Sequence, residues 1–232
     1  SYNVGRDYEA NDVLLRNMDG KAVQHREIVP GDKTLKTTAT LTTISQIGEL
    51  IIENFEVVCT IEDEVVYTVS TVFGFFPPDA MVAQKGLKIN DRERLIFDRL
   101  HTNVVDLNER PTLYFDHPTL HLPDSKLLML DRITYMDGVD GEAGLGSVRG
   151  EKDVDVTEWF FKAHFFQDPV QPGSLGIEAM LQLIQAFMIK QNMHEGFENP
   201  RFEPVIINSE AEWHYRGQIT PDKNLITIDF EC

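Results

Sequence analysis

The chain has 232 residues, of which 42% are hydrophobic, so it can form a globular core in one large domain or two small ones. Its formal net charge is −17 and its 21 Lys and Arg residues are scattered, which argues against a nucleic acid partner; we interpret the acidic excess as solvated faces. No apolar run reaches the ~18 residues of a membrane span and no signal peptide is evident, so we expect a soluble, cytoplasmic protein with no membrane partner.

Residues 35–76 alternate between apolar and polar side chains with a period of two. The alternation predicts three antiparallel strands with one buried face, at residues 35–41, 55–61 and 65–73. The breaks "SQIGE" and "EDE" between them have lengths suited to hairpins. We therefore expect a meander, which Pro77 and Pro78 end.

The chain after this meander changes character. We interpret residues 1–90 as the strand-rich later half of one unit, residues 91–108 as a charged linker with weak helical spacing, and residues 109–232 as a second unit. In the second unit, "KLLMLDRITYM" predicts a short helix or strand that leads into a strand, and the Gly-rich "DGVDGEAGLGSVRG" predicts a turn between two strands.

A helix is predicted over residues 174–191. The segment "LGIEAMLQLIQAFMIK" is apolar at nearly every position, so this helix should be buried on all sides. Pro172 and Gly173 form a turn before it, and Ser174 is the expected N-cap. Because strand patterns precede and follow the helix, we expect an α+β fold in which an antiparallel sheet wraps around one central helix.

The two ends of the chain are similar in pattern. Residues 13–41 and 205–230 both run from an apolar triplet through a polar middle to an Ile, a Pro, an Asp-Lys pair and a strand. The similarity indicates either an internal repeat or two unrelated strand-turn-strand segments. If it is a repeat, we expect the chain to be a piece of a longer polypeptide, with its second unit truncated at the C-terminus.

His164 and Glu178 are titratable residues inside the most hydrophobic segment, "WFFKAHFFQDPVQPGSLGIEAMLQLIQ". A histidine among phenylalanines is more often a satisfied core residue, and a glutamate near a helix start is usually stabilised by the helix dipole at the surface. Placed on the two sides of a Pro-Gly turn, however, they also form a candidate catalytic pair, because a polar group buried among apolar side chains is costly unless it is paired.

The same segment closely resembles the active-site segment of the β-hydroxyacyl-carrier-protein dehydratases of bacterial fatty acid synthesis, which have the hot-dog fold. The family pattern His-Phe-x-x-x-Pro-Val-x-Pro-Gly-x-Leu-x-x-Asp/Glu-Ala is matched at every stated position, and the resemblance covers residues 110–232. Residues 12–90, with "VLLRNMDGKAVQ", "TISQIGELII" and "VFGFFPPDAM", resemble the dehydratase region of polyunsaturated fatty acid synthases. The resemblance implies portions of tandem hot-dog units.

The resemblance also implies roles for single residues. His164 corresponds to the catalytic histidine and Glu178 to the catalytic acid of the family. Gly173 corresponds to the glycine whose N–H polarises the thioester carbonyl, and Val170 to the residue whose carbonyl orients the histidine. The implied substrate-binding residues also include Gln182, beside the acid, and Phe165, next to the histidine. Isomerising members have Asp at the position of Glu178, so the implied reaction is dehydration.

The implied reaction converts a 3-hydroxyacyl thioester into a 2-enoyl thioester without a metal or an organic cofactor. The implied partners are an acyl carrier protein with its phosphopantetheine-linked acyl chain, and other domains of a megasynthase. Since the family builds each site from two hot-dog units, a homodimer or pseudodimer is expected.

Two other functions compete with dehydration. A hot-dog thioesterase would use a carboxylate to activate water and does not need the His-Phe-x-x-x-Pro-Val-x-Pro-Gly segment. A non-catalytic hot-dog unit would act as a scaffold of a megasynthase or dock its carrier protein. Turnover by the protein and by its His164→Ala variant distinguishes these functions.

Overall fold

The computed structural model describes the chain outside residues 1–12, 85, 99–102, 137–142, 166 and 204. It contains two compact units, each built from two stretches of chain. Unit 1 comprises residues 1–87 and 205–217, and unit 2 comprises residues 88–204 and 218–232. The division into segments 1–90, 91–108 and 109–232 that we expected from the sequence stays a prediction. Part of the expected Gly-rich turn after residue 136 lies outside the described residues.

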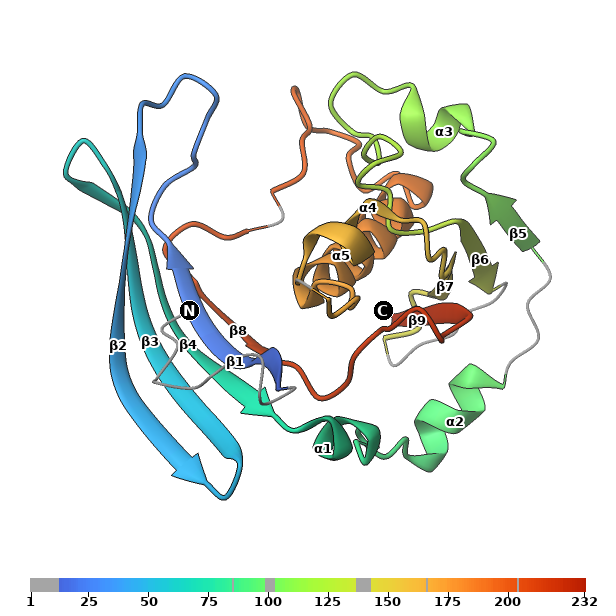
Figure 1. The fold of residues 1–232 in the computed structure, drawn as a ribbon. Coiled ribbons are helices and arrows are strands. Elements are labelled where there is room, and N and C mark those ends of the chain that lie inside the picture. The colour runs from blue at the N-terminus through green and yellow to red at the C-terminus, as the bar shows by residue number, and fades with distance from the viewer. Residues whose placement is uncertain (1–12, 85, 99–102, 137–142, 166, 204) are drawn as a thin grey trace. The chain divides into compact units, whose positions relative to one another are not determined.

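A five-stranded antiparallel sheet makes up most of unit 1 (Figure 1). Its strands lie in the order β2-β3-β4-β1-β8. Their bounds are Leu14–Gln24 for β1, Leu35–Ile47 for β2, Leu50–Ile61 for β3, Glu64–Phe76 for β4 and Glu210–His214 for β8. Strands β2 to β4 pair consecutively, which confirms the predicted meander.

Both hairpins of the meander have two-residue turns. Gly48 and Glu49 join β2 to β3, and Gly48 has a φ of 62°. Glu62 and Asp63 join β3 to β4 with φ values of 49° and 71°. Positive φ at both central residues, as at Glu62 and Asp63, or at the first one, as at Gly48, gives a turn whose twist matches paired strands. The strands therefore extend closer to each turn than their alternation indicated.

Pro77 and Pro78 end β4, as predicted. Pro77 is extended, with φ −64° and ψ 147°, and Pro78 is the first residue of helix α1 (Pro78–Val82). Proline suits the first helical position because its missing N–H would have no acceptor there. The same pair therefore terminates a strand and begins a helix.

The two similar segments at the ends of the chain have similar backbones. In each, a strand leads into a four-residue turn with Pro in its second position, followed by another strand. Asp32 N donates to Val29 O at 2.9 Å in the first turn, and Lys223 N donates to Thr220 O at 3.0 Å in the second. The first strands, β1 and β8, pair with each other in unit 1, whereas the following strands, β2 and β9, belong to different sheets.

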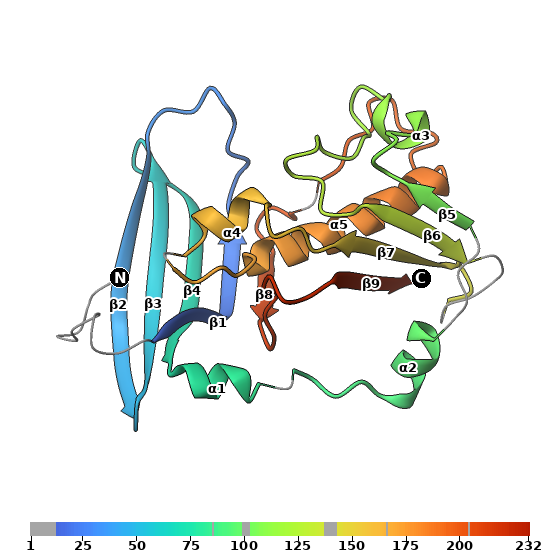
Figure 2. The same cartoon turned by 45° about the vertical axis from the view of Figure 1, so that its right-hand side comes forward.

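Unit 2 contains a four-stranded antiparallel sheet in the order β5-β6-β7-β9, with α5 packed against β7 and β9 (Figure 2). The strand bounds are Asn103–Asp106 for β5, Arg132–Met136 for β6, Ser147–Asp153 for β7 and Leu225–Glu231 for β9. The helix bounds are Asp91–Phe97 for α2, Thr112–Phe115 for α3, Trp159–Ala163 for α4 and Gly173–Lys190 for α5. The expected linker thus includes α2 and β5.

The core of unit 2 lies between α5 and the sheet. Leu183 and Ala186 of α5 are fully buried with Ile133 of β6. Gly150 of β7 permits this close packing, because a Cβ atom there would lie 2.8 Å from Leu130 Cδ2 and 3.1 Å from Leu183 Cδ1. Burial of a Leu or Ile side chain such as Leu183 or Ile133 stabilises the fold by roughly 1.5–3 kcal/mol.

Helix α5 confirms the predicted central helix but differs from it in two details. It begins at Gly173, and the preceding Pro172 supplies no side-chain cap, so the expectation of Ser174 as N-cap was wrong. Ile177, Met180 and Met188 are 36%, 53% and 36% exposed, because only one side of α5 packs on the sheet. None of the described helices combines the length and hydropathy needed to cross a bilayer.

Candidate active site

The N-terminus of α5 presents accessible backbone N–H groups. Gly173 and Ser174 are exposed, and their positions in the first turn leave their N–H groups without an intrahelical acceptor. Pro172 provides no side-chain oxygen to cap them. These donors lie at the positive end of the dipole of an 18-residue helix. The helix start can therefore bind a carbonyl oxygen or an anion.

His164 lies directly after α4, and its ring is fixed by the segment that leads to α5. Its Nδ1 is 3.0 Å from the carbonyl oxygen of Val170. A carbonyl oxygen only accepts, so Nδ1 carries the hydrogen in this contact, and in the neutral imidazole Nε2 is the free acceptor. This contact leaves Nε2 of the half-buried His164 as the ring nitrogen that can accept a proton.

The carbonyl of Val170 is itself held in place. Val170 is 3% exposed, and the next residue, Gln171, donates its N–H to Ile219 O at 2.9 Å. The Phe165 ring also lies 4.0 Å from the His164 ring, centroid to centroid, at an interplanar angle of 34°. The imidazole is therefore restrained both by a hydrogen bond and by ring packing.

Glu178 lies in α5, one turn before the fully buried Gln182. Gln182 Nε2 donates to Glu178 Oε1 at 2.8 Å and to Leu127 O at 2.7 Å, while Gln182 Oε1 accepts from Met129 N at 2.8 Å. This places one oxygen of Glu178 and leaves Oε2 as the oxygen that can exchange a proton. Sequence patterns gave no indication of the role of the 127–129 segment, whose backbone fixes Gln182.

Replacing Gln182 by Leu is expected to lower the free energy of unfolding by about 2–3 kcal/mol, because Met129 N–H and Leu127 C=O lose their buried partner. Urea denaturation measures this difference. The matched control is Gln185→Leu on the same helix, where Gln185 is half-buried and should change stability much less. Equal losses in the two variants would contradict the assigned role.

Lys152 is a further residue of the site's support that sequence analysis missed. It is 7% exposed on β7, and its Nζ lies 3.0 Å from Glu158 Oε1 and 3.6 Å from Asp131 Oδ1. Glu158 immediately precedes α4, the helix that His164 directly follows. The buried ammonium therefore ties the sheet to the helix that carries the histidine.

Lys152→Met should destabilise the protein by about 2–4 kcal/mol, because it leaves two partly buried carboxylates without their cation. Thermal and urea unfolding will measure this loss. Lys162→Met, on the exposed surface of α4, provides the control and should stay within about 0.5 kcal/mol of the parent. A Lys152 variant as stable as the Lys162 variant would show that the ion pairs contribute nothing.

The structure groups the predicted site residues as follows. His164 contacts both Phe165 and Val170 before α5, Gly173 starts the helix, and Glu178 contacts Gln182. Within the described part of the chain, no hydrogen bond or ion pair joins His164 to Glu178. The same described residues contain no cluster of three or more His, Cys, Asp or Glu residues suited to a metal.

Unit 2 has an α+β hot-dog fold, in which a sheet packs on one long central helix. A fixed histidine lies before this helix and a carboxylate lies within it. Residues 122–232 match the model of the FabA-like domain family. The resemblance predicted from the His-Phe to Glu-Ala motif is thereby confirmed.

Comparison with a curated protein extends the similarity to nearly the whole chain. The chain is 32% identical over 228 residues to one of the subunits of a polyunsaturated fatty acid synthase from Thraustochytrium sp.. The match covers 92% of this chain and 15% of the relative, so the chain spans a small part of the relative's length.

Two dehydratases are among the solved structures that the chain matches. An inactive mutant of the CurK dehydratase is 10% identical, with a TM-score of 0.47, over 93% of this chain and 66% of that chain. A MaoC-like dehydratase is 14% identical, with a TM-score of 0.34, over 75% of this chain and 55% of that chain.

Proposed function

We propose that this protein removes water from 3-hydroxyacyl thioesters, carried on an acyl carrier protein, to give 2-enoyl thioesters in polyunsaturated fatty acid synthesis. The contact between His164 Nδ1 and Val170 O, next to the open start of α5 at Gly173, carries this proposal. It supplies an oriented base and an oxyanion donor in one segment. The FabA-like match and the synthase relative support the same reaction.

The first chemical event is removal of a proton from the α-carbon of the thioester. Nε2 of His164 takes this proton, because Nδ1 is engaged with Val170. The electron pair of the broken C–H bond moves toward the thioester carbonyl, whose oxygen becomes negative. The Gly173 N–H at the helix start stabilises this oxygen, a contribution of about 3 kcal/mol per donor at such sites.

The second event is departure of the hydroxyl group from the β-carbon. Protonated Glu178 donates from Oε2 to the leaving oxygen, so the C–O bond breaks, water leaves and the double bond forms between the α- and β-carbons. The imidazolium of His164 and the carboxylate of Glu178 then return to their starting forms by net proton transfer through water. Gln182 holds Oε1 throughout, which directs Oε2 toward the substrate.

The proposal includes the partners that such a reaction needs. The substrate arrives on the phosphopantetheine arm of an acyl carrier protein, and other domains of a cytoplasmic megasynthase act before and after this step. The synthase relative, of which this chain matches 15%, supports the last point. The histidine and acid of one site come from two hot-dog units of a homodimer or pseudodimer; a strictly monomeric yet fully active protein in analytical ultracentrifugation would argue against this.

The function is tested by incubating the protein with acyl carrier protein that carries a short or a long 3-hydroxyacyl chain. Mass spectrometry then measures the mass of the acylated carrier protein. Dehydration predicts the loss of one water from the carrier-bound chain. Release of a free acid would identify a thioesterase, and an unchanged carrier would favour a scaffold or docking role; either result overturns the proposal.

A further inference from the structure

Trp159, the first residue of α4, makes a hydrogen bond that has no part in the chemical steps proposed above. Its indole Nε1 donates to the carbonyl oxygen of Lys126 at 3.1 Å. Its ring lies 5.7 Å from the ring of Phe160, centroid to centroid, in an edge-on arrangement. Trp159 is 46% exposed, whereas Phe160 is 1% exposed in the core of unit 2. The indole therefore lies at the surface, but its direction is restrained by both contacts.

The start of α4 is a rigid support for this indole. Phe160 and Phe161, the two residues after Trp159, are buried in the core. Glu158, directly before the helix, pairs with the buried Lys152 at 3.0 Å. The first turn of α4 is thus fixed both to the core and to the sheet, so unit 2 as a whole sets the position of the indole.

The carbonyl that accepts from the indole belongs to the backbone segment that holds Gln182. The carbonyl oxygen of Leu127, the residue after Lys126, accepts from Gln182 Nε2 at 2.7 Å. Met129 N donates to Gln182 Oε1 at 2.8 Å. Gln182 Nε2 also donates to Glu178 Oε1 at 2.8 Å. The indole is therefore connected to the carboxylate of Glu178 through this segment and Gln182.

The segment has a shape of its own before the indole contacts it. Leu127 N and Leu128 N donate to Asp124 O at 2.9 Å and 3.0 Å, which forms a tight turn. Leu128 and Met129 then enter the core, where they are buried. The indole hydrogen bond joins this turn to α4, a helix that begins 33 residues after Lys126. Loss of that bond should leave the turn intact but less firmly placed beside α5.

We propose that Trp159 is a positioning residue of the dehydratase site. Its indole N–H holds the 126–129 backbone in the place from which Gln182 directs Glu178. The inference rests on the proposed function, because it takes Glu178 as the acid of the reaction. Rates of proton transfer are sensitive to small displacements of the reacting groups, so a loosened support slows the step that uses the acid.

The proposed base is held by different contacts. His164 Nδ1 lies 3.0 Å from Val170 O, and the Phe165 ring packs on the imidazole. Neither contact involves the indole of Trp159 or the 126–129 backbone. Loss of the indole N–H should therefore slow departure of the hydroxyl group and leave removal of the α-proton nearly unchanged.

Trp159→Phe tests the proposal, because it keeps an aromatic ring beside Phe160 and removes the N–H donor. Initial rates of α-proton exchange in D₂O and of enoyl formation are measured on the same 3-hydroxyacyl thioester. Exchange should stay within about two-fold of the parent, while kcat for enoyl formation falls about five- to ten-fold, a factor that corresponds to one net hydrogen bond. A general loss of folded protein would lower both rates by the same factor.

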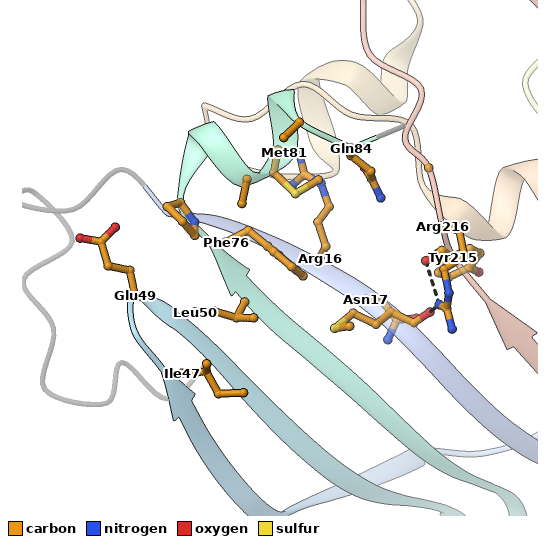
Figure 3. Close-up of a pocket in the computed structure, with 15 residues that line it drawn as sticks. Arg16, Asn17, Ile47, Glu49, Leu50, Phe76, Met81, Gln84, Tyr215 and Arg216 are labelled. Carbon is orange, nitrogen blue, oxygen red and sulfur yellow. Dashed lines mark hydrogen bonds between the residues drawn. The ribbon is translucent and has the colours of Figure 1, made fainter. Parts of the chain in front are cut away.

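Trp213→Phe is the matched control, since it removes the same donor from the other tryptophan of the chain. Trp213 Nε1 donates to Asn17 Oδ1 at 2.8 Å. Figure 3 shows Asn17 in the wall of a cavity whose lining residues all belong to unit 1. This hydrogen bond has no connection to Gln182 or Glu178, so the variant should change neither rate.

A double variant shows whether Trp159 acts through Gln182. Gln182→Leu removes the contacts to the 126–129 backbone and to Glu178. In that background, Trp159→Phe should slow enoyl formation by less than about two-fold more, because residues that act through one chain of contacts are not additive.

The Met129 amide reports on the same connection without turnover. Its N–H donates to Gln182 Oε1, so NMR should show slow exchange in the parent and about five- to ten-fold faster exchange in Trp159→Phe. The Leu107 amide, which donates to Asp131 O at 2.8 Å in the same unit, should keep its parental rate. Faster exchange of both amides would indicate general destabilisation and count against the proposal.

The proposal is overturned if Trp159→Phe forms the enoyl product at the parental rate, or if it slows α-proton exchange as much as enoyl formation. An effect that is undiminished in the Gln182→Leu background would also overturn it. A parent protein that does not dehydrate thioesters would refute the proposed function, and the Met129 amide would then decide whether Trp159 fixes the backbone that holds Gln182. An active parent whose Met129 amide is unaffected by Trp159→Phe would refute this inference alone.

Discussion

The His164→Ala variant should eliminate water from a 3-hydroxyacyl thioester about 10²–10⁴-fold more slowly than the parent protein, the range expected for loss of a positioned general base. The loss should appear mainly in kcat, because the imidazole acts on a proton that moves only during the reaction. Continuous measurement of the enoyl thioester formed gives both constants.

The matched control for this variant is His121→Ala. His121 is exposed in the loop that follows α3. Its Nδ1 lies 2.9 Å from the carbonyl oxygen of the neighbouring Leu122. Its removal should leave turnover within about two-fold of the parent. Circular dichroism should show both variants folded. If the His164 variant keeps the rate of the His121 variant, histidine base catalysis is refuted.

A second large loss, also about 10²–10⁴-fold, is expected for Glu178→Gln, because an amide has no acidic proton to give to the leaving hydroxyl. The side chain keeps its shape, and its carbonyl oxygen can still accept from Gln182 Nε2. Stability should therefore change little while turnover falls. Steady-state kinetics and urea denaturation on the same preparation separate the two quantities.

Glu195→Gln serves as the control for the acid, because Glu195 is an exposed carboxylate in the turn after α5. It should retain full activity. A Glu178 variant that still dehydrates at the parental rate would move the acid to another group. A variant that is inactive because it is unfolded would be recognised by its urea transition, and Glu178→Asp, which retains an acid, then provides the comparison.

Local patterns were sufficient where neighbouring residues determine the structure. The period of two predicted the β2–β4 meander, whose pairs are close in the chain. The run of apolar residues after Pro172 predicted α5 to within one residue at each end. The motif around His164 placed the histidine, the helix start and the carboxylate in one segment, and their roles stay a prediction.

One helix that we interpreted as part of a linker is indicated by a local sequence motif. Helix α2 begins with a capping box, in which Asn90 Oδ1 accepts from Glu93 N at 2.9 Å and Glu93 Oε2 accepts from Asn90 N at 2.7 Å. The sequence "NDRE" contains this spacing, so the segment interpreted as a linker could have been recognised as a helix start.

Other features depend on residues that are distant in the chain, and no local pattern encodes them. Strand β8 joins β1 across about 190 residues, with Lys21 opposite Glu212. Gln182 forms hydrogen bonds with the backbone of residues 127 and 129. Other side chains at these two positions could leave the same backbone groups in place, so the residue types do not indicate the contact. The sequence alone indicates that Lys152 is a surface residue of an acidic chain. The structure places it on β7, beside Asp131 and Glu158.

The roles of His164 as base and Glu178 as acid are tested most directly by hydrogen exchange at the α-carbon of the substrate. The 3-hydroxyacyl thioester is incubated with the protein in D₂O, and the exchange is followed by NMR. We predict that Glu178→Gln still exchanges this proton while forming no enoyl product, because His164 and the Gly173 N–H remain in place. We predict that His164→Ala does neither. Exchange by the His164 variant, or its complete absence from the Glu178 variant, would contradict the account.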